Sequence, residues 1–242
     1  MTYKLLERFR ALFDGQVYRH RDSTNGDKVA LELFEDLLDL GRSQKYVTRA
    51  AAGSRVVNTR NLVTGKENRR GDGSLGELLP HLQPQATPGF NVPRGPIANI
   101  EIGVETKILA KAMIKQIDRV MSDLENQARV FRSRGGSPIC IAIVGINQAT
   151  QYLSYEGRRD GRDVTFPTTG NAGYRHPAQE CAEAERRIRQ RVGPLYDELI
   201  ILPFVATNQA PHTFAWAKPQ VVLNEYGAAL LRISQEYDAR VP

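Results

Sequence analysis

The chain is poor in the residues that build disulfide frameworks and histidine metal sites. It has two cysteines, four histidines and one tryptophan among 242 residues. Cys140 stands in an apolar run and Cys181 in a charged run, a pattern typical of free thiols. The histidines have no metal-ligand spacing and form no HNH-like pair. They are His20, His81, His176 and His212. A disulfide-stabilised fold and a zinc site are therefore both unexpected.

Long apolar runs and nucleotide-binding motifs are lacking as well. No stretch of eighteen apolar residues occurs, and no apolar segment follows the Met-Thr-Tyr-Lys start, which predicts a cytoplasmic protein without a membrane partner. The sequence has no P-loop, no dinucleotide-binding glycine string and no Gly-x-Ser-x-Gly elbow. We therefore expect no nucleotide-driven motor in this chain.

Positive charge is in excess, and much of it is clustered. The formal net charge is +6 and the pI is about 9.4. Clustered Lys and Arg side chains neutralise phosphates and release counterions, so a polyanionic partner is indicated. A solvated protein face is the alternative explanation for each cluster. The densest groups are Arg69 and Arg70, then Arg158, Arg159 and Arg162, then Arg186, Arg187, Arg189 and Arg191.

The apolar periodicity predicts an α/β fold with a mixed central sheet flanked by helices, in one domain over 1–242. A strand, a helix after Lys107 and a second strand follow one another, which is the order of a βαβ crossover with a parallel pair. Helices are expected at about 2–14, 25–40, 110–131, 178–192 and 224–237, and strands at about 99–109, 139–146, 198–206 and, in short form, 221–223. The core is predicted at about 25–41, 98–146 and 196–238. Polar, turn-rich insertions are predicted at about 42–95 and 148–178, the first with a possible hairpin near 54–66.

The predicted strand at 99–109 places acids and a lysine on one face. Strand side chains alternate, so Glu101, Glu105 and Lys107 point away from Ile102 and Val104. Charges next to β-branched residues are costly to desolvate unless they bind a partner such as a divalent metal and an anionic substrate. This face is therefore a catalytic candidate.

With an upstream acid, a strand bearing Glu105-Thr106-Lys107, a following helix and a buried strand, the chain resembles the PD-(D/E)XK nuclease superfamily. The resemblance implies a restriction-endonuclease-like core in which Glu105 is a metal ligand and Lys107 positions water or stabilises charge. It further implies a Mg²⁺ cofactor, with Mn²⁺ as a substitute, a double-stranded DNA substrate and a homodimer. The expected activity is that of a type II-like restriction endonuclease hydrolysing phosphodiester bonds. The alternatives are a non-restriction nuclease of this fold, for repair, junction resolution or phage defence, and a non-catalytic DNA-binding module.

The second metal-binding acid is left open, because no Pro-Asp pair precedes the Glu-x-Lys triplet. Asp72 and Glu77 bracket a glycine-rich string and are equal candidates, with Glu101 as an additional or substitute ligand. Glu32 or Glu35 on the early helix is a further candidate for a metal ligand. The alternative is that these carboxylates face solvent.

The helix after Lys107 carries two further signals. Gln116 interrupts its apolar face, so we expect a buried amide that braces the site. Val120 stands where the tyrosine of the superfamily's Gln-x-x-x-Tyr branch would be. Lys111 and Lys115 begin a basic stripe that is a candidate for DNA contact.

Overall fold

The computed structural model describes residues 2–20, 22, 24–63, 66–67, 71–111, 113–133, 136–159, 162–167 and 177–242. For 59–63, 66–67, 154–159 and 162–167 it describes the backbone alone. The helices are α1 (Lys4–Ala11), α2 (Thr24–Leu40), α3 (Gln44–Ala51), α4 (Met113–Arg132), α5 (Pro177–Arg191) and α6 (Pro219–Arg240), with a short 3-10 turn η1 (Gly193–Leu195). Within the described residues, no helix has both the length and the apolar character needed to cross a membrane.

The strands form one large mixed sheet and a separate hairpin. The large sheet has the order β11-β10-β7-β6-β3-β1-β5-β4, and β2 pairs with β1. β6 with β7, β7 with β10 and β1 with β5 are parallel, and the remaining neighbours are antiparallel. The strands are β1 (Arg55–Val63), β2 (Lys66–Glu67), β3 (Gly73–Glu77), β4 (Gln85–Thr87), β5 (Phe90–Ile97), β6 (Ile102–Leu109), β7 (Ile139–Asn147), β8 (Leu153–Arg159), β9 (Arg162–Pro167), β10 (Glu198–Ala206) and β11 (Phe214–Trp216). The mixed α/β architecture is therefore confirmed.

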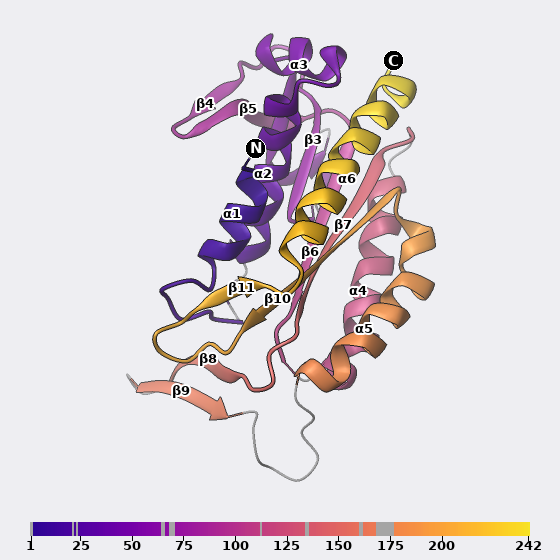
Figure 1. Ribbon diagram of the computed structural model, residues 1–242. Helices are drawn as coiled ribbons and strands as arrows, with labels where there is room; N and C mark the ends of the chain where they lie inside the picture. The colour runs from indigo at the N-terminus through magenta and orange to yellow at the C-terminus, as the bar shows by residue number, and fades with distance from the viewer. Residues whose placement is uncertain are drawn as a thin grey trace.

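Helices cover both faces of the sheet. α1, α2, α3 and α6 lie over one face, while α4 and α5 lie over the other (Figure 1). The central strand β7 is buried along its whole length. Its Ile141 and Ile143 pack toward the first layer, and Ala142 and Val144 toward the second. The wholly apolar sequence of β7 is what a strand covered on both faces requires.

The prediction that 42–95 is a polar, turn-rich insertion is wrong, because this region supplies α3 and the strands β1 to β5. Its glycines suggested turns, yet several of them lie inside strands where a neighbour approaches closely. A Cβ at Gly73 would lie 3.0 Å from Ala30 Cβ, and one at Gly95 would lie 2.7 Å from Leu78 Cδ1. Glycine is required here for packing and not for a turn. The hairpin expected between residues 54–58 and 62–66 is wrong, because residues 55–58 and 62–63 lie in the single strand β1; the antiparallel pairing joins Leu62 to Glu67 and Val63 to Lys66 of β2.

Two other boundaries differ from the sequence-based prediction. The region 148–178 contains the hairpin of β8 and β9 and the start of α5, and residues 168–176 lie outside the described part. The short strand expected at 221–223 is wrong, because these residues belong to α6, which begins with Pro219 in its first turn. Proline is well tolerated at that position of a helix.

The acids of α2 are structural, so neither the metal role nor the solvent-facing role considered for Glu32 and Glu35 holds. Glu35 is 1% exposed and accepts the backbone N–H groups of Asn91 and Val92 at 2.9 and 2.7 Å. Asp36 accepts the N–H groups of Lys4 and Leu5 at 2.7 and 3.0 Å and the Tyr226 hydroxyl at 2.7 Å. Glu32 bonds Arg8. These carboxylates fasten α1, β5 and α6 to α2.

Replacing Glu35 by alanine should lower the free energy of unfolding by about 2–4 kcal/mol, because the buried Val92 N–H and the partly buried Asn91 N–H lose their acceptor. The matched control is Asp39→Ala, which removes a half-exposed partner of Lys4 and should cost about 0.5 kcal/mol or less. Urea denaturation followed by circular dichroism measures both. Equal losses in the two variants would contradict the structural role of Glu35.

Candidate active site

A fork between two strands forms the site. β3 and β6 pair over Gly73 to Leu75 against Ile102 to Val104. β6 then continues to Leu109 in register with β7. Glu105 and Lys107 therefore lie on the part of β6 that is beyond the pairing with β3. The residue just before β3 lies beside this part of β6.

That residue is Asp72, and two hydrogen bonds fix it to β6. Its N–H donates to the Val104 carbonyl at 3.1 Å. Its Oδ2 accepts the Thr106 N–H at 2.7 Å. The two bonds flank Glu105 along the strand, so Asp72 is held beside Glu105. Of the two equal candidates, the structure brings Asp72 to the Glu-x-Lys strand.

Glu105 and Lys107 lie on the same strand face, as the alternation predicts. Lys107 Nζ donates to Glu105 Oε1 at 2.7 Å. The Glu105 side chain is 4% exposed and that of Lys107 is 22% exposed. The lysine therefore reaches solvent from a site whose carboxylate is buried.

Three glycines allow the chain to close around these groups. A Cβ at Gly26, in the first turn of α2, would lie 2.5 Å from Asp72 Cγ. A Cβ at Gly71 or Gly103 would lie 2.6 or 2.7 Å from the ring of Phe131 on α4. Gly71 also has a φ of +68°, a conformation that favours glycine. Helix α2 and the ring of Phe131 can therefore approach Asp72 and its strand only because these positions lack side chains.

The electrostatics of the fork favour a cation. Burial, and after it the negative charge of Glu105, raise the pKa of Asp72 from its ordinary value of 3.8 to about 7, although the Thr106 hydrogen bond and the charge of Lys107 act to lower it. Asp27, half-buried in the first turn of α2, adds a smaller upward contribution. Without a cation, the second negative charge is costly.

The donor set fits a hard, hydrated metal ion. Asp72 and Glu105 offer carboxylate oxygens, the ligands that Mg²⁺ prefers, and Mg²⁺ commonly takes one or two carboxylates and completes its shell with water and substrate phosphate. Over the described ranges, no group of three or more His, Cys, Asp or Glu side chains is arranged to hold an ion. The protein thus offers a pair of carboxylates and a lysine.

The other candidate acids lie away from the fork. Glu77 is exposed at the opposite end of β3, beside Arg55 of β1 in the register of the sheet. Glu101 precedes β6, about 13 Å along the strand from Glu105. Its oxygens accept Arg55 Nε at 2.6 Å and the Tyr237 hydroxyl at 2.8 Å. Glu101 therefore joins β1 and α6 to the start of β6 and is not brought to Glu105.

The expectation that Gln116 is buried is wrong, because Gln116 is exposed. The apolar stripe of α4 consists of Met113, Ile117, Met121, Leu124, Ala128 and Phe131. The periodicity of the sequence predicted a stripe through Met113, Gln116, Val120 and Leu124, whereas the observed stripe passes through Ile117 and Met121 in place of Gln116 and Val120. The buried amide of this helix is Gln127, one turn before Phe131. Gln116 and Gln127 are eleven residues apart and so lie on nearly the same side of the helix, which means that helical periodicity alone does not distinguish them.

Sequence reasoning also missed Asp27. Its charge acts on Asp72 because the first turn of α2 packs against that residue. In the sequence, Asp27 is indistinguishable from an ordinary acid in the first turn of a helix, where it complements the helix dipole.

The structure describes only some of the residues predicted to bind DNA. Lys111 immediately precedes α4, and Lys115 is exposed in its first turn. Arg158, Arg159 and Arg162 lie at the turn end of the β8 and β9 hairpin, where only the backbone is described. Arg69 and Arg70 lie outside the described residues.

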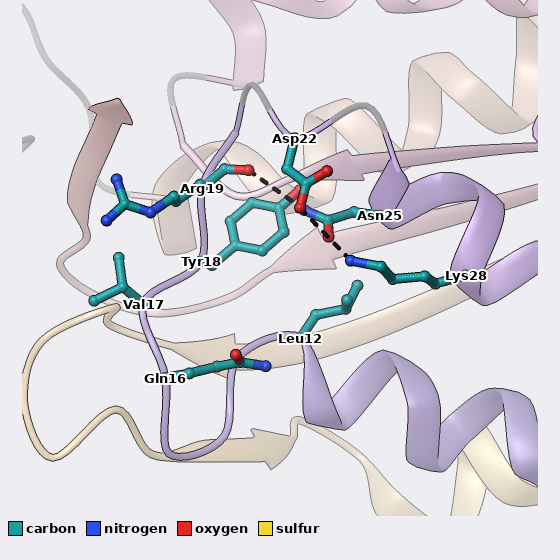
Figure 2. A pocket seen from close by; sticks show the side chains of 8 residues that line it. All are labelled: Leu12, Gln16, Val17, Tyr18, Arg19, Asp22, Asn25 and Lys28. Atoms are coloured by element: carbon teal, nitrogen blue, oxygen red, sulfur yellow. Dashed lines mark hydrogen bonds and ion pairs between the residues drawn. The ribbon is translucent and has the colours of Figure 1, made fainter. Parts of the chain in front are cut away.

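A pocket of about 220 Å³ adjoins the first turn of α2. Figure 2 shows its lining residues, Leu12, Gln16, Val17, Tyr18, Arg19, Asp22, Asn25 and Lys28. Lys28 Nζ lies 3.6 Å from Asp22 Oδ2, and Asn25 Nδ2 donates to the Arg19 carbonyl at 3.3 Å. Because Asn25 precedes Gly26, the pocket and the Asp72 carboxylate both border the same helical turn.

Searches against family models, curated proteins and solved structures found no match to this chain. Its function is therefore inferred from the geometry of the site.

The raised pKa of Asp72 predicts a pH dependence of stability. The unfolded chain releases this proton near pH 4 and the folded, metal-free protein retains it to about pH 7, so unfolding releases a proton between these values. Rising pH therefore weakens the folded state across this window, and the effect levels off above it. Asp72→Asn keeps an acceptor for Thr106 and removes the titrating group.

The measurement is urea unfolding in chelator at several pH values from about 4 to 8, the window in which the two states bind different numbers of protons. The Asp72→Asn protein should gain stability relative to wild type as pH rises toward 7. Parallel profiles for the two proteins would show that Asp72 is not held in its protonated form.

Proposed function

We propose that this chain is a Mg²⁺-dependent endodeoxyribonuclease, most specifically a type II-like restriction endonuclease. The observation that supports this is the convergence of Asp72 with Glu105 and Lys107 through the Thr106 N–H. One acid comes from the residue before β3 and the other from β6, and the lysine lies two residues from Glu105 on the same face. Such an arrangement suits phosphodiester hydrolysis.

Asp72 and Glu105 would hold the ion. Their position at the strand fork leaves them backed by Phe131 and the first turn of α2, so the ligands are held by packed elements and not by a free loop. When bound, Mg²⁺ acidifies a coordinated water and offsets charge on the phosphate. Mn²⁺ prefers the same oxygen ligands and should substitute.

Lys107 supplies the cation at the reacting group. Its ammonium is held by Glu105 at 2.7 Å while its side chain remains partly exposed. An ammonium donor at this position can orient the attacking water or stabilise charge that develops on the phosphate oxygens. Because Glu105 contacts it directly, binding of a metal to Glu105 and the position of Lys107 are coupled.

Double-stranded DNA is the proposed substrate. The chain has an excess of positive charge, and Lys111 and Lys115 at the start of α4 follow directly on the strand that carries the site. Lys28 lines the pocket that borders the same helical turn as Asp72 and adds a further cation. A phosphate backbone crossing the fork would meet these side chains.

The test is cleavage of supercoiled plasmid and long linear DNA in Mg²⁺. Lys107→Ala and Asp72→Asn should each lower the rate by about 100-fold or more, since each removes a group that acts on the transition state. Glu77→Gln is the matched control, because it changes an exposed acid of the same strand region and should leave the rate unchanged. Chelator should abolish cleavage by all proteins.

The outcomes separate the alternatives. Discrete fragments indicate a site-specific endonuclease, and dispersed fragments indicate a non-restriction nuclease of this fold. DNA binding without cleavage in Mg²⁺ or Mn²⁺ would contradict the proposal and leave a non-catalytic DNA-binding module. A Glu77→Gln protein as impaired as Asp72→Asn would contradict the assignment of the ligands.

A further inference from the structure

The arginine cluster on α5 is neutralised within the chain. Each of its four arginines lies within ion-pair distance of a carboxylate on α4 or α5, namely Glu125, Glu183 or Glu185. The pairs at Glu183 measure 2.7 Å and the pair at Glu185 measures 2.8 Å. Ion pairs along and between helices account for this cluster, so it needs no polyanionic partner.

The cluster on the β8 and β9 hairpin is different, because the strand register divides it into two kinds of pair. Arg158 lies opposite Asp163, a pair of unlike charges. Arg159 lies opposite Arg162, a pair of like charges. Residues at opposite positions of an antiparallel pair have Cβ atoms about 5 Å apart, and like charges there are destabilising. The pair of Arg159 and Arg162 therefore favours a partner that supplies negative charge or hydrogen-bond acceptors.

A buried asparagine fixes the root of this hairpin to the large sheet. Asn208 is 3% exposed, and its Nδ2 donates to the carbonyls of Leu153 and Tyr18 at 2.8 and 3.0 Å. The Leu153 N–H donates in turn to the Thr207 carbonyl at 2.8 Å. The start of β8 is therefore held at the carboxyl end of β10.

The same edge of the sheet holds the end of β6, the strand that carries Glu105 and Lys107. Asn147 Nδ2 donates to the carbonyl of Ala110, just after β6, at 3.1 Å and to that of Ala206, at the end of β10, at 2.8 Å. Figure 1 shows the hairpin at this end of the molecule, apart from the large sheet. Neither β8 nor β9 pairs with any other strand in the described part of the chain. The hairpin is thus a separate two-stranded ribbon at the edge where β6 ends.

We propose, on the basis of the nuclease function proposed above, that this hairpin enters the major groove of the DNA and that Arg159 and Arg162 bind guanine there. The major groove is about 12 Å wide and about 8.5 Å deep, and it admits a two-stranded β-ribbon. β8 has seven residues and so extends about 20 Å from its root. The far end of the ribbon can therefore reach base edges while its root stays on the sheet.

The chemistry of arginine favours contact with bases over contact with phosphates. A guanidinium donates two parallel hydrogen bonds to O6 and N7 of guanine, the commonest specific contact in the major groove. Lysine carries the same charge but lacks this planar fork. Phosphate contacts position a protein on DNA without reading its sequence. Arg159 and Arg162 therefore set the sequence preference, and exchanging them for lysine separates that role from charge alone.

The test is selection of bound duplexes from a pool of randomised sequence, in chelator, followed by sequencing of the bound fraction. Wild type should enrich duplexes with guanine at fixed positions. The double variant Arg159→Lys with Arg162→Lys should bind the unselected pool with the affinity and salt dependence of wild type, because its charge is unchanged. Its preference for guanine at those positions should fall by about 10-fold or more, because the bidentate contacts are lost.

The matched control is Arg186→Lys with Arg189→Lys, which makes the same two exchanges on α5, where both arginines already pair with carboxylates. It should keep the preference of wild type. Retained binding of the unselected pool shows that each variant is folded. A wild type that enriches no sequence, or a hairpin variant that selects as wild type does, would overturn the proposal. A hairpin variant that loses affinity for all sequences alike would place the two arginines on phosphates and would also overturn it.

The selection needs no cleavage, so its outcome is separate from that of the nuclease assay. Guanine selection by a protein that cleaves no DNA would refute the proposed activity alone. Cleavage at unchanged positions by the hairpin variant would refute the role of the hairpin alone.

Discussion

One hydrogen bond, from the Thr106 N–H to Asp72 at 2.7 Å, holds the site together. This bond lies at the fork, where the pairing of β6 with the start of β3 stops at Val104 and β6 continues alongside β7. Without an acceptor there, the Thr106 amide, which lies beyond the pairing of β6 with β3, would need water or another partner. The bond instead brings a carboxylate from a distant part of the chain to within reach of Glu105. The glycines that admit α2 and Phe131 matter because they let this contact form.

Carboxylates bind β6 in two places, at its start and in its middle, and they differ in how their charge is balanced. At its start, Glu101 is neutralised by Arg55 and bonded by the Tyr237 hydroxyl. At the fork, two carboxylates, those of Asp72 and Glu105, face one ammonium, that of Lys107. The first group is balanced within the protein and therefore structural. In the second, the raised pKa of Asp72 shows that two ionised carboxylates beside one ammonium are costly, and a bound cation would remove that cost.

The sequence was sufficient for the elements with an unbroken apolar period. The helix at 25–40, the β6, α4 and β7 unit and the strand at 198–206 were predicted because each has a continuous pattern of period 3.6 or 2, or a buried run. The strands within 42–95 were missed because glycine in them serves close packing, which only the folded neighbours reveal. In the same way, the helix α4 was found, but Gln116 and Gln127 lie on nearly the same side of it, and only the folded neighbours decide that Gln127 is the buried one.

The site was predictable only in part, for a comparable reason. Glu105 and Lys107 share a face by alternation along one strand, which is a local property. The choice between Asp72 and Glu77 depends on the register of β3 against β6, which local sequence does not specify. The effect of Asp27 likewise depends on the contact of its helical turn with Asp72, which local sequence does not reveal.

The most direct test of a metal centre at the fork is anomalous diffraction from crystals soaked in Mn²⁺. We predict a single strong peak between the carboxylates of Asp72 and Glu105, lost in Asp72→Asn crystals and retained in Glu77→Gln crystals. A peak elsewhere, or none at the fork in wild-type crystals, would contradict the account.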